Sequence, residues 1–245
     1  MKVIALIPAR LGATRFPAKL LAPLMGKSVI RRTYESAVGT GLFDEVMVVT
    51  DSDEILNEVM AHGGKAVKSK GVYESGTDRI AEIAASMDAD VFVNVQGDEP
   101  LVQKAPLAQL VELFKDHEDV QVASLVQFLT DPMLVIDPNY VKVALGLNNN
   151  ALFFSRSVIP YPRNVELNIP YYEHIGVYAF RKKALMDFTN WPMTPLEAVE
   201  KIECLRFLEH GVPIRMAITQ YLGVEIDMPE DIVRAEELMR KNGWA

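Results

Sequence analysis

The chain has 245 residues, of which 49% are hydrophobic and 24% are charged, and its formal net charge is -8. This composition is typical of a globular protein, and an acidic chain argues against general nucleic-acid binding, which needs a basic face. No segment approaches the roughly 20 apolar residues of a membrane span, the N-terminal apolar run is too short for a signal peptide, and the single cysteine, Cys204, excludes an intrachain disulfide framework. We therefore expect a cytoplasmic protein with neither nucleic acid nor membrane as a partner.

The first half of the chain alternates short apolar runs with helical patterns. Strands are predicted at residues 3–7, 45–50, 65–68, 91–95 and 121–127, and helices at 28–38, 53–62, 77–87 and 106–115. Continuous apolar runs of this length are typical of strands buried on both faces. Their alternation with helices predicts βαβ units, and therefore a three-layer α/β fold with a mostly parallel sheet and right-handed crossovers.

The pattern changes after residue 131. Strand-like pieces at 141–145, 151–154 and 176–180 are separated by turn and proline signals, which predicts an antiparallel extension suited to a substrate lid or a dimer contact. A helix at 195–211, a strand at 214–218 and a helix at 229–241 follow. The sequence contains no linker or internal repeat, so we expect one domain over residues 1–245, with 131–181 as an embellishment.

The loop after the first predicted strand, residues 8–19, is strongly cationic. It lacks the glycine fingerprint of a dinucleotide fold and the P-loop motif, and carries Arg10, Arg15 and Lys19 instead. No acidic residue occurs before position 34. Arginine forks and a lysine point charge at the carboxyl end of a strand are suited to binding a triphosphate. A solvated loop is the alternative, and three cations without an acidic partner favour the anion site.

Two acidic residues are candidates for holding a metal ion. Asp98 directly follows the strand at 91–95, on the same sheet edge as the cationic loop, where a carboxylate beside phosphates suits Mg²⁺. Asp227 ends another apolar run and is a candidate second carboxylate. Each also has a plain explanation, because Asp98 is placed to cap a helix and Asp227 lies beside a helix start at Pro229. The spacing alone leaves both alternatives open.

A third motif, Ser75-Gly76-Thr77, precedes the helix at 77–87. Its backbone N–H groups and hydroxyls are suited to contacting a nucleotide. Ser75 or Thr77 serves equally well as an ordinary helix N-cap, so both explanations stay open.

Taken together, these segments resemble the CMP-Kdo synthetases, the 3-deoxy-manno-octulosonate cytidylyltransferases, over almost the whole length. The similar stretches are IPARLGATRFPAK, GKSVIRRTYE, VVTDSDEI, ESGTDRI, VNVQGDEP, ALFFSRSVIPYPR, EHIGVYAFRK, LEAVEKIECLR and IDMPEDI. The sialic-acid cytidylyltransferases share the fold and the opening loop but not this whole set. The resemblance implies a nucleotide-binding, Rossmann-like nucleotidyltransferase fold and a homodimer in which residues 151–163 form a contact.

The resemblance also implies an activity: activation of Kdo by CTP, with Mg²⁺, for lipopolysaccharide biosynthesis. The residues it implies for catalysis are Arg10, Lys19, Asp98 and Asp227, with Asp98 and Asp227 as metal ligands. The residues it implies for CTP binding are Pro8, Ala9, Arg10, Arg15, Lys19, Ser75, Gly76, Thr77, Arg79 and Asp98. For the sugar it implies Gln96, Arg156, His174, Tyr178, Glu200 and Glu203, with Glu197 on an adjacent helical turn.

The sequence departs from the family pattern at three places: Leu20, Cys204 and the acidic stretch 224–226. None removes an implied ligand, but they leave Kdo and its 8-amino analogue as alternative sugars. Two further alternatives are a CMP-sialic acid synthetase-like enzyme and a non-catalytic nucleotide-binding homologue, because a fold does not by itself define a function.

Overall fold

The computed structural model describes residues 1–12, 15–71, 73, 75–115, 117–164, 166–167, 169–221 and 223–244. The chain forms two compact units, one made of Met1–Leu107 with Leu222–Ala245 and the other of Ala108–Tyr221. The second unit therefore begins earlier than the embellishment expected at 131–181, and the expectation of a single domain stays a prediction. Among the described residues, no helix has the length and apolar character needed to cross a bilayer.

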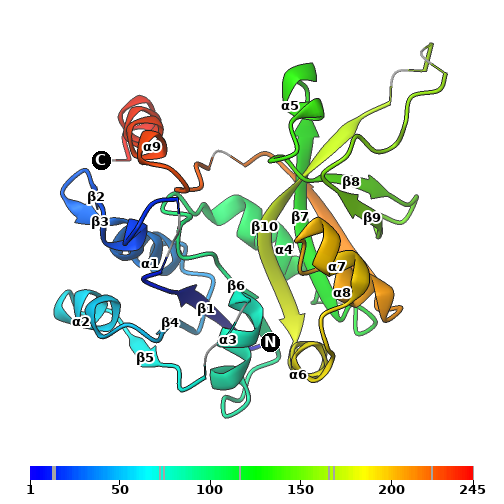
Figure 1. Cartoon of the computed structure of the whole chain (residues 1–245). Coiled ribbons are helices and arrows are strands. Elements are labelled where there is room, and N and C mark those ends of the chain that lie inside the picture. Colours follow the sequence, from blue (N-terminus) through cyan, green and yellow to red (C-terminus); the bar gives the residue numbers. More distant parts are fainter. Residues whose placement is uncertain are drawn as a thin grey trace. The chain divides into compact units, whose positions relative to one another are not determined.

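The first unit contains a parallel sheet in the order β5-β4-β1-β6 (Figure 1). Its strands are β1 (Val3–Ala9), β4 (Glu45–Thr50), β5 (Ala66–Lys68) and β6 (Val91–Asn94). Every residue of β1 and β6 is buried, as expected for apolar strands covered on both faces. Strand β1 is hydrogen-bonded on both sides, with Val3 opposite Val91 of β6 and Ile4 opposite Glu45 of β4.

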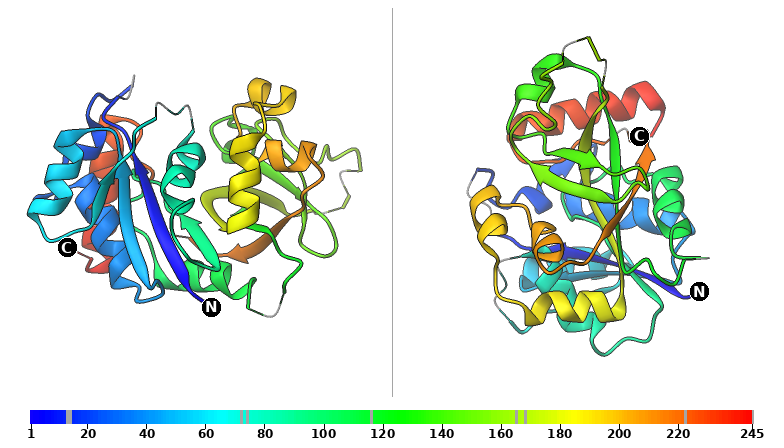
Figure 2. Two further views of the ribbon diagram at one scale, coloured as in Figure 1. Left: turned by 90° about the horizontal axis from the view of Figure 1, so that it is seen from below. Right: turned by 90° about the vertical axis from the view of Figure 1, so that its right-hand side faces the viewer.

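Helices cover both faces of this sheet. Helices α1 (Val29–Gly39) and α2 (Asp53–Ala61) lie on one face, and α3 (Gly76–Ala84) lies on the other (Figure 2). Right-handed crossovers require this arrangement, because the chain moves from β1 outward to β5 and then returns to β6 on the far side of β1. The direction of winding therefore reverses between β1 and β6. In open α/β sheets this switch point, at the carboxyl ends of the strands, is where ligands bind.

Smaller elements complete the first unit. A 3₁₀ turn, η1 (Lys19–Leu21), and a hairpin of β2 (Pro23–Leu24) and β3 (Lys27–Ser28) follow β1. The closing helix α9 (Pro229–Asn242) packs against β2, where Glu236 accepts a hydrogen bond of 3.3 Å from Met25 N–H. Helix α4 (Lys104–Glu112) contains the point at which the chain passes into the second unit.

The second unit contains the antiparallel part of the fold. Strand β7 (Val122–Leu129) pairs antiparallel with β10 (Tyr171–Arg181) and parallel with β11 (Ile214–Thr219). Strands β8 (Lys142–Leu145) and β9 (Ala151–Ser155) add an antiparallel hairpin beside β10. The helices of this unit are α5 (Pro132–Ile136), α6 (Lys182–Asn190), α7 (Pro195–Glu200) and α8 (Leu205–Glu209).

The predicted α/β class, with a mostly parallel sheet and an antiparallel portion, is confirmed. The predicted continuous helix at 195–211 is wrong, because α7 ends at Lys201, which adopts a left-handed conformation with φ of 55°. Two short helices result, and the chain folds back on itself. Strand β10 is longer than predicted, since its first half, Tyr171–Ile175, is too polar to form an apolar run. Helices α5 and α6 were not predicted.

Candidate active site

The exits of β1 and β6 approach each other closely at the switch point. A Cβ atom at Gly97 would lie 2.8 Å from the carbonyl oxygen of Pro8, so only glycine permits this approach. The buried hydroxyl of Thr33, on α1, donates a 2.8 Å hydrogen bond to the carbonyl oxygen of Gly97. These contacts place Asp98, the next residue, beside the end of β1.

A segment from the far end of the chain lies against Asp98. The backbone N–H of Ile226 donates a 3.0 Å hydrogen bond to the carbonyl oxygen of Asp98, and the Ile226 side chain is fully buried. Asp231, in the first turn of α9, accepts hydrogen bonds from the backbone N–H groups of Asp227 (3.0 Å) and Met228 (2.8 Å). The structure thus brings Asp227 next to Asp98, with its backbone held from both sides.

Lys19 lies between these two carboxylates. Its Nζ is 2.6 Å from Oδ2 of Asp98 and 2.8 Å from Oδ1 of Asp227. Burial lowers the pKa of Lys19, but the charge of Asp98 and the hydrogen bonds to both acids outweigh burial and raise the pKa above its ordinary value. Arg15 donates a 2.5 Å hydrogen bond to the other oxygen of Asp227. Two cations of the loop, Arg15 and Lys19, are therefore paired with acids far away in the sequence, Asp98 and Asp227.

A third carboxylate, Glu225, joins the group. Asp98, Glu225 and Asp227 each offer one oxygen, and these atoms all lie within 4.8 Å of one another. Desolvation, followed by the charges of Asp98 and Asp227, raises the pKa of Glu225, although the residue as a whole is exposed. Glu225 was not among the predicted metal ligands, because the stretch 224–226 departs from the family pattern. The sequence signal that could have identified Glu225 is the alternation of acidic and apolar residues in 224–227. In an extended chain this alternation puts Glu225 and Asp227 on one side and the buried Ile226 on the other.

These residues fit a magnesium ion. Carboxylate oxygens are the donors that Mg²⁺ prefers, three of them converge here, and the Lys19 ammonium already bridges two of them. A positive charge is therefore stabilised at this position in the folded chain.

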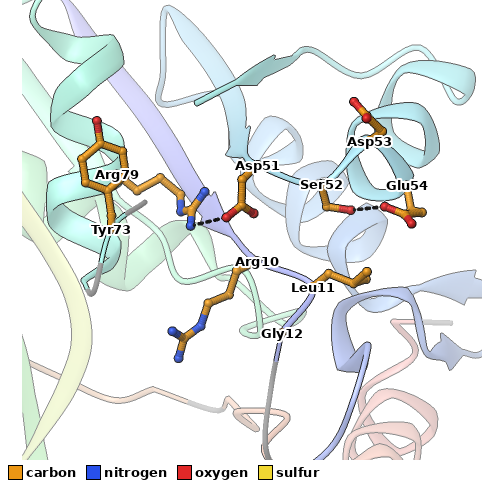
Figure 3. A pocket seen from close by; sticks show the side chains of 9 residues that line it. All are labelled: Arg10, Leu11, Gly12, Asp51, Ser52, Asp53, Glu54, Tyr73 and Arg79. Atoms are coloured by element: carbon orange, nitrogen blue, oxygen red, sulfur yellow. Dashed lines mark hydrogen bonds and ion pairs between the residues drawn. The ribbon is translucent and has the colours of Figure 1, made fainter. Parts of the chain in front are cut away.

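A separate pocket of about 510 Å³ opens in the same unit (Figure 3). It is lined by Arg10, Leu11, Gly12, Asp51, Ser52, Asp53, Glu54, Tyr73 and Arg79. The side chain of Arg79 is only 4% exposed and donates to Ser69 Oγ (2.8 Å) and to Asp51 Oδ2 (2.9 Å). Arg10 is exposed and makes no hydrogen bond or ion pair within the described part of the chain. Arg10 is thus available to bind a ligand, whereas the hydrogen bonds of Arg79 to Ser69 and Asp51 hold it in the pocket wall.

The Ser75-Gly76-Thr77 motif begins α3 on the same side. The Ser75 hydroxyl accepts a 3.0 Å hydrogen bond from the backbone N–H of Asp78, so it is the helix N-cap. Gly76 packs against Pro8, since a Cβ atom there would lie 3.0 Å from the proline ring, and 3.7 Å from Oε1 of Gln96. Thr77 is buried and its hydroxyl lies 3.3 Å from Asn94 Nδ2. The motif and Gln96 therefore lie beside Pro8 and Ala9, the end of β1.

The other residues implied for the sugar lie in the second unit, where Arg156 and Glu200 meet. Oε1 of Glu200 accepts a hydrogen bond from Ser155 Oγ (2.7 Å), and Oε2 accepts one from the Arg156 backbone N–H (3.0 Å). The Arg156 guanidinium donates in turn to the carbonyl oxygen of Glu200 (2.7 Å). Glu200 thereby holds the end of β9.

His174 and Tyr178 form a second group in that unit. Their rings lie 5.2 Å apart, and the Nε2 atom of His174 is 3.0 Å from Ser124 Oγ. Burial lowers the pKa of His174 to about 4, so the imidazole is neutral. Burial, followed by the proximity of Cys204 and Glu203, raises the pKa of Tyr178 well above its ordinary value. Glu203 therefore belongs to this group.

Glu197 is committed to a different role. Its carboxylate receives two hydrogen bonds from Arg206, at 2.7 Å and 2.6 Å, and both side chains are about 95% buried. In a straight helix, residues nine apart are separated by roughly 13 Å along the axis, so this pair requires the turn at Lys201. Glu197 therefore joins α7 to α8, whereas Glu200 contacts the end of β9 and Glu203 lies near Tyr178.

A cationic loop and converging carboxylates at the switch point of a parallel sheet are the features expected of a nucleotidyltransferase. The cytidylyltransferase family model matches residues 4–218. The 3-deoxy-manno-octulosonate cytidylyltransferase of Flavobacterium johnsoniae is 52% identical over 242 residues, which is 98% of this chain and 99% of that protein. The protein of the same name from Christiangramia forsetii is 51% identical, over 97% of each chain. The chain belongs to the family of 3-deoxy-manno-octulosonate cytidylyltransferases.

Solved structures agree with this assignment. A structure of CMP:2-keto-3-deoxy-manno-octonic acid synthetase complexed with CTP superimposes with a TM-score of 0.94 and 35% identity, covering 99% of this chain and 100% of that one. A 4-diphosphocytidyl-2C-methyl-D-erythritol synthase from Anaerococcus prevotii superimposes with a TM-score of 0.65 at 15% identity, covering 98% of each chain, and so shares the fold.

Proposed function

We propose that this chain joins the CMP part of CTP to 3-deoxy-D-manno-octulosonate and releases pyrophosphate. The observation that carries this proposal is the group of three carboxylates, Asp98, Glu225 and Asp227, of which Lys19 bridges Asp98 and Asp227, in a chain whose relatives bear the name of this activity. Paired carboxylates beside phosphate-binding cations are suited to phosphoryl chemistry, in which the protein chiefly positions the partners and neutralises charge. The sialic-acid and non-catalytic alternatives are not favoured.

The reaction is an in-line displacement. The oxygen of the sugar's anomeric hydroxyl forms a bond to the α-phosphorus, that hydroxyl gives its proton to solvent, and the bond from the α-phosphorus to the oxygen of pyrophosphate breaks. Arg10, which has no partner within the described residues, would bind the phosphates of CTP. Lys19 would release a carboxylate and turn its ammonium toward the departing pyrophosphate.

Asp98 and Asp227 would hold Mg²⁺, with Glu225 within reach as a further ligand. When bound, the ion would polarise the α-phosphate and lower the pKa of the attacking hydroxyl. Arg15, paired with Asp227, would keep that carboxylate oriented. Cys204 is buried, and burial raises its pKa far above the ordinary value, so it is unsuited to act as a nucleophile.

The residues proposed to contact the sugar are Gln96, Arg156, His174, Tyr178, Glu200 and Glu203. The side chain of Glu200 is engaged with Ser155 and Arg156, which supports a positioning role for Glu200 and a binding role for the Arg156 guanidinium. A homodimer and a place in lipopolysaccharide biosynthesis, which rest on the family resemblance, and a cytoplasmic location, which rests on the composition and the single cysteine, complete the proposal.

A pyrophosphate-release screen tests this function. CTP and the other nucleoside triphosphates are each offered with Kdo, its 8-amino analogue or sialic acid, with Mg²⁺ or with EDTA. We expect release with CTP, an octulosonate and Mg²⁺, and no release in EDTA. CTP binding without release for any sugar would favour the non-catalytic alternative, and release with sialic acid alone would show that the sugar is misassigned.

A further inference from the structure

One acidic side chain of α3 organises the segment that leads into this helix. Glu82 accepts hydrogen bonds from the backbone N–H of Lys70 (3.0 Å) and of Gly71 (3.3 Å), and from the hydroxyl of Tyr73 (2.7 Å). Backbone N–H groups outside helices and strands need such partners. Three donors from one short segment therefore converge on a single carboxylate.

The ring of Tyr73 lies against Gly71. A Cβ atom built on Gly71 would lie 2.4 Å from Cζ and 2.5 Å from the hydroxyl oxygen of Tyr73. No side chain fits in that space, so the ring can occupy this position only because residue 71 is glycine. Glycine at position 71 therefore leaves the room that the ring occupies, and Glu82 sets the direction of the Tyr73 hydroxyl.

Arg79 lies on another side of the ring. Its Cζ atom is 6.0 Å from the ring centroid, and the guanidinium is anchored by Ser69 and Asp51. Figure 3 shows Tyr73 beside Arg79 in the wall of the pocket, with Arg10 reaching from the end of β1. Tyr73 and Arg79 are both held by hydrogen bonds in this wall, whereas Arg10 supplies a charge that is unpaired within the described residues.

We propose that Tyr73 is a pre-positioned wall for the nucleoside part of CTP, that Glu82 is the positioning residue that holds it, and that glycine at position 71 leaves the space that the ring needs. This inference rests on the proposed function, because the occupant of the pocket is taken to be the nucleotide. The pocket volume of about 510 Å³ suits a ligand of that size. An aromatic ring stacks on a nucleobase, whereas phosphates require the cations. The Glu82 carboxylate stays hydrogen-bonded to Lys70, Gly71 and Tyr73 and acts through Tyr73.

The test separates the nucleoside from the phosphates. Binding of CTP and of inorganic tripolyphosphate is measured by calorimetry, in Mg²⁺, for wild type and for Glu82→Ala, Gly71→Ala and Tyr73→Phe. We expect CTP affinity to fall about tenfold in the first two and about threefold in Tyr73→Phe, which keeps the ring and loses one hydrogen bond. Tripolyphosphate affinity should stay within about twofold of wild type. Glu237→Gln, an exposed glutamate on α9, is the matched control and should bind both ligands normally.

Steady-state kinetics provide the second measurement. Glu82→Ala should raise KM for CTP and leave KM for the sugar unchanged, and Glu82→Gln, which keeps one acceptor oxygen, should recover part of the loss. Equal losses of CTP and tripolyphosphate affinity, or normal CTP affinity in a folded Glu82→Ala protein, would overturn the inference. If Glu82→Ala fails to fold, Tyr73→Phe and Glu82→Gln decide the question by the same measurements. If wild type binds CTP but releases no pyrophosphate, the proposed function is wrong. The CTP affinities of the variants then still test whether Tyr73 contacts the nucleoside.

Discussion

Replacing Lys19 by methionine tests how the carboxylate group is held together. The ammonium of Lys19 is the cation that joins Asp98 to Asp227, at 2.6 and 2.8 Å. Methionine keeps the length of the side chain and removes the charge. In Lys19→Met, the three carboxylates within 4.8 Å of one another face each other without this counter-charge.

The structure sets the size of the effect. Two unit charges 4.8 Å apart repel by about 3.5 kcal/mol at an effective dielectric constant of 20. The side chains of Asp98 and Asp227 are 18% and 31% exposed, so solvent weakens this repulsion, and we expect Lys19→Met to lose about 2 kcal/mol of unfolding free energy in EDTA. Mg²⁺ no longer competes with an ammonium in the variant, and 2 kcal/mol corresponds to about 30-fold tighter binding.

Urea denaturation with and without Mg²⁺ measures both quantities. Lys19→Met should gain about 2 kcal/mol more stability from Mg²⁺ than wild type does, because ligand binding stabilises the folded state by mass action. Lys68→Met is the matched control. Lys68 forms an exposed ion pair with Asp53, so this change should alter stability by less than about 1 kcal/mol and leave the response to Mg²⁺ unchanged.

Two results would refute the reasoning. If Mg²⁺ stabilises wild type and Lys19→Met equally, the ion and the ammonium do not share the carboxylates. If Lys19→Met is no less stable in EDTA than Lys68→Met, the group carries no strain between like charges.

Three further predictions concern other parts of the molecule. Asp98→Asn should fold normally and lower CTP- and Mg²⁺-dependent turnover on the order of 10³-fold; near-normal turnover would remove Asp98 from the metal site. Burial lowers the pKa of His174 to about 4, so between about pH 6.5 and pH 4 only the unfolded chain binds a proton there. The free energy of unfolding should therefore decrease by up to about 3 kcal/mol as the pH is lowered through this range. His174→Gln should flatten that part of the profile in urea titrations, and an unchanged slope would contradict the assignment. Glu197→Met and Arg206→Met should each cost about 3–5 kcal/mol and the double variant less than their sum, whereas additive losses would show that the two side chains do not couple.

Local patterns in the sequence were sufficient for the class of fold. The apolar run that became β1 and the helical spacing that became α1 are properties of consecutive residues. Their alternation predicts a parallel sheet, whose carboxyl edge then predicts the position of Asp98 and of the cationic loop. The family resemblance added the names of the site residues. The break at Lys201 was missed, because the buried pair of Glu197 and Arg206 that accompanies it joins residues nine apart.

By itself, then, the sequence determined which segments form strands and helices, and which ends of those strands carry charged side chains. Only the tertiary structure decided that Lys19 meets Asp98, 79 residues away, and Asp227, 208 residues away. It also added Glu225 to that group. The physical reason is that these contacts depend on a backbone hydrogen bond from Ile226 to Asp98 and on the close approach at Gly97. Contacts between segments that are distant in the sequence produce no periodic pattern in the residues around them, so local patterns do not predict these contacts.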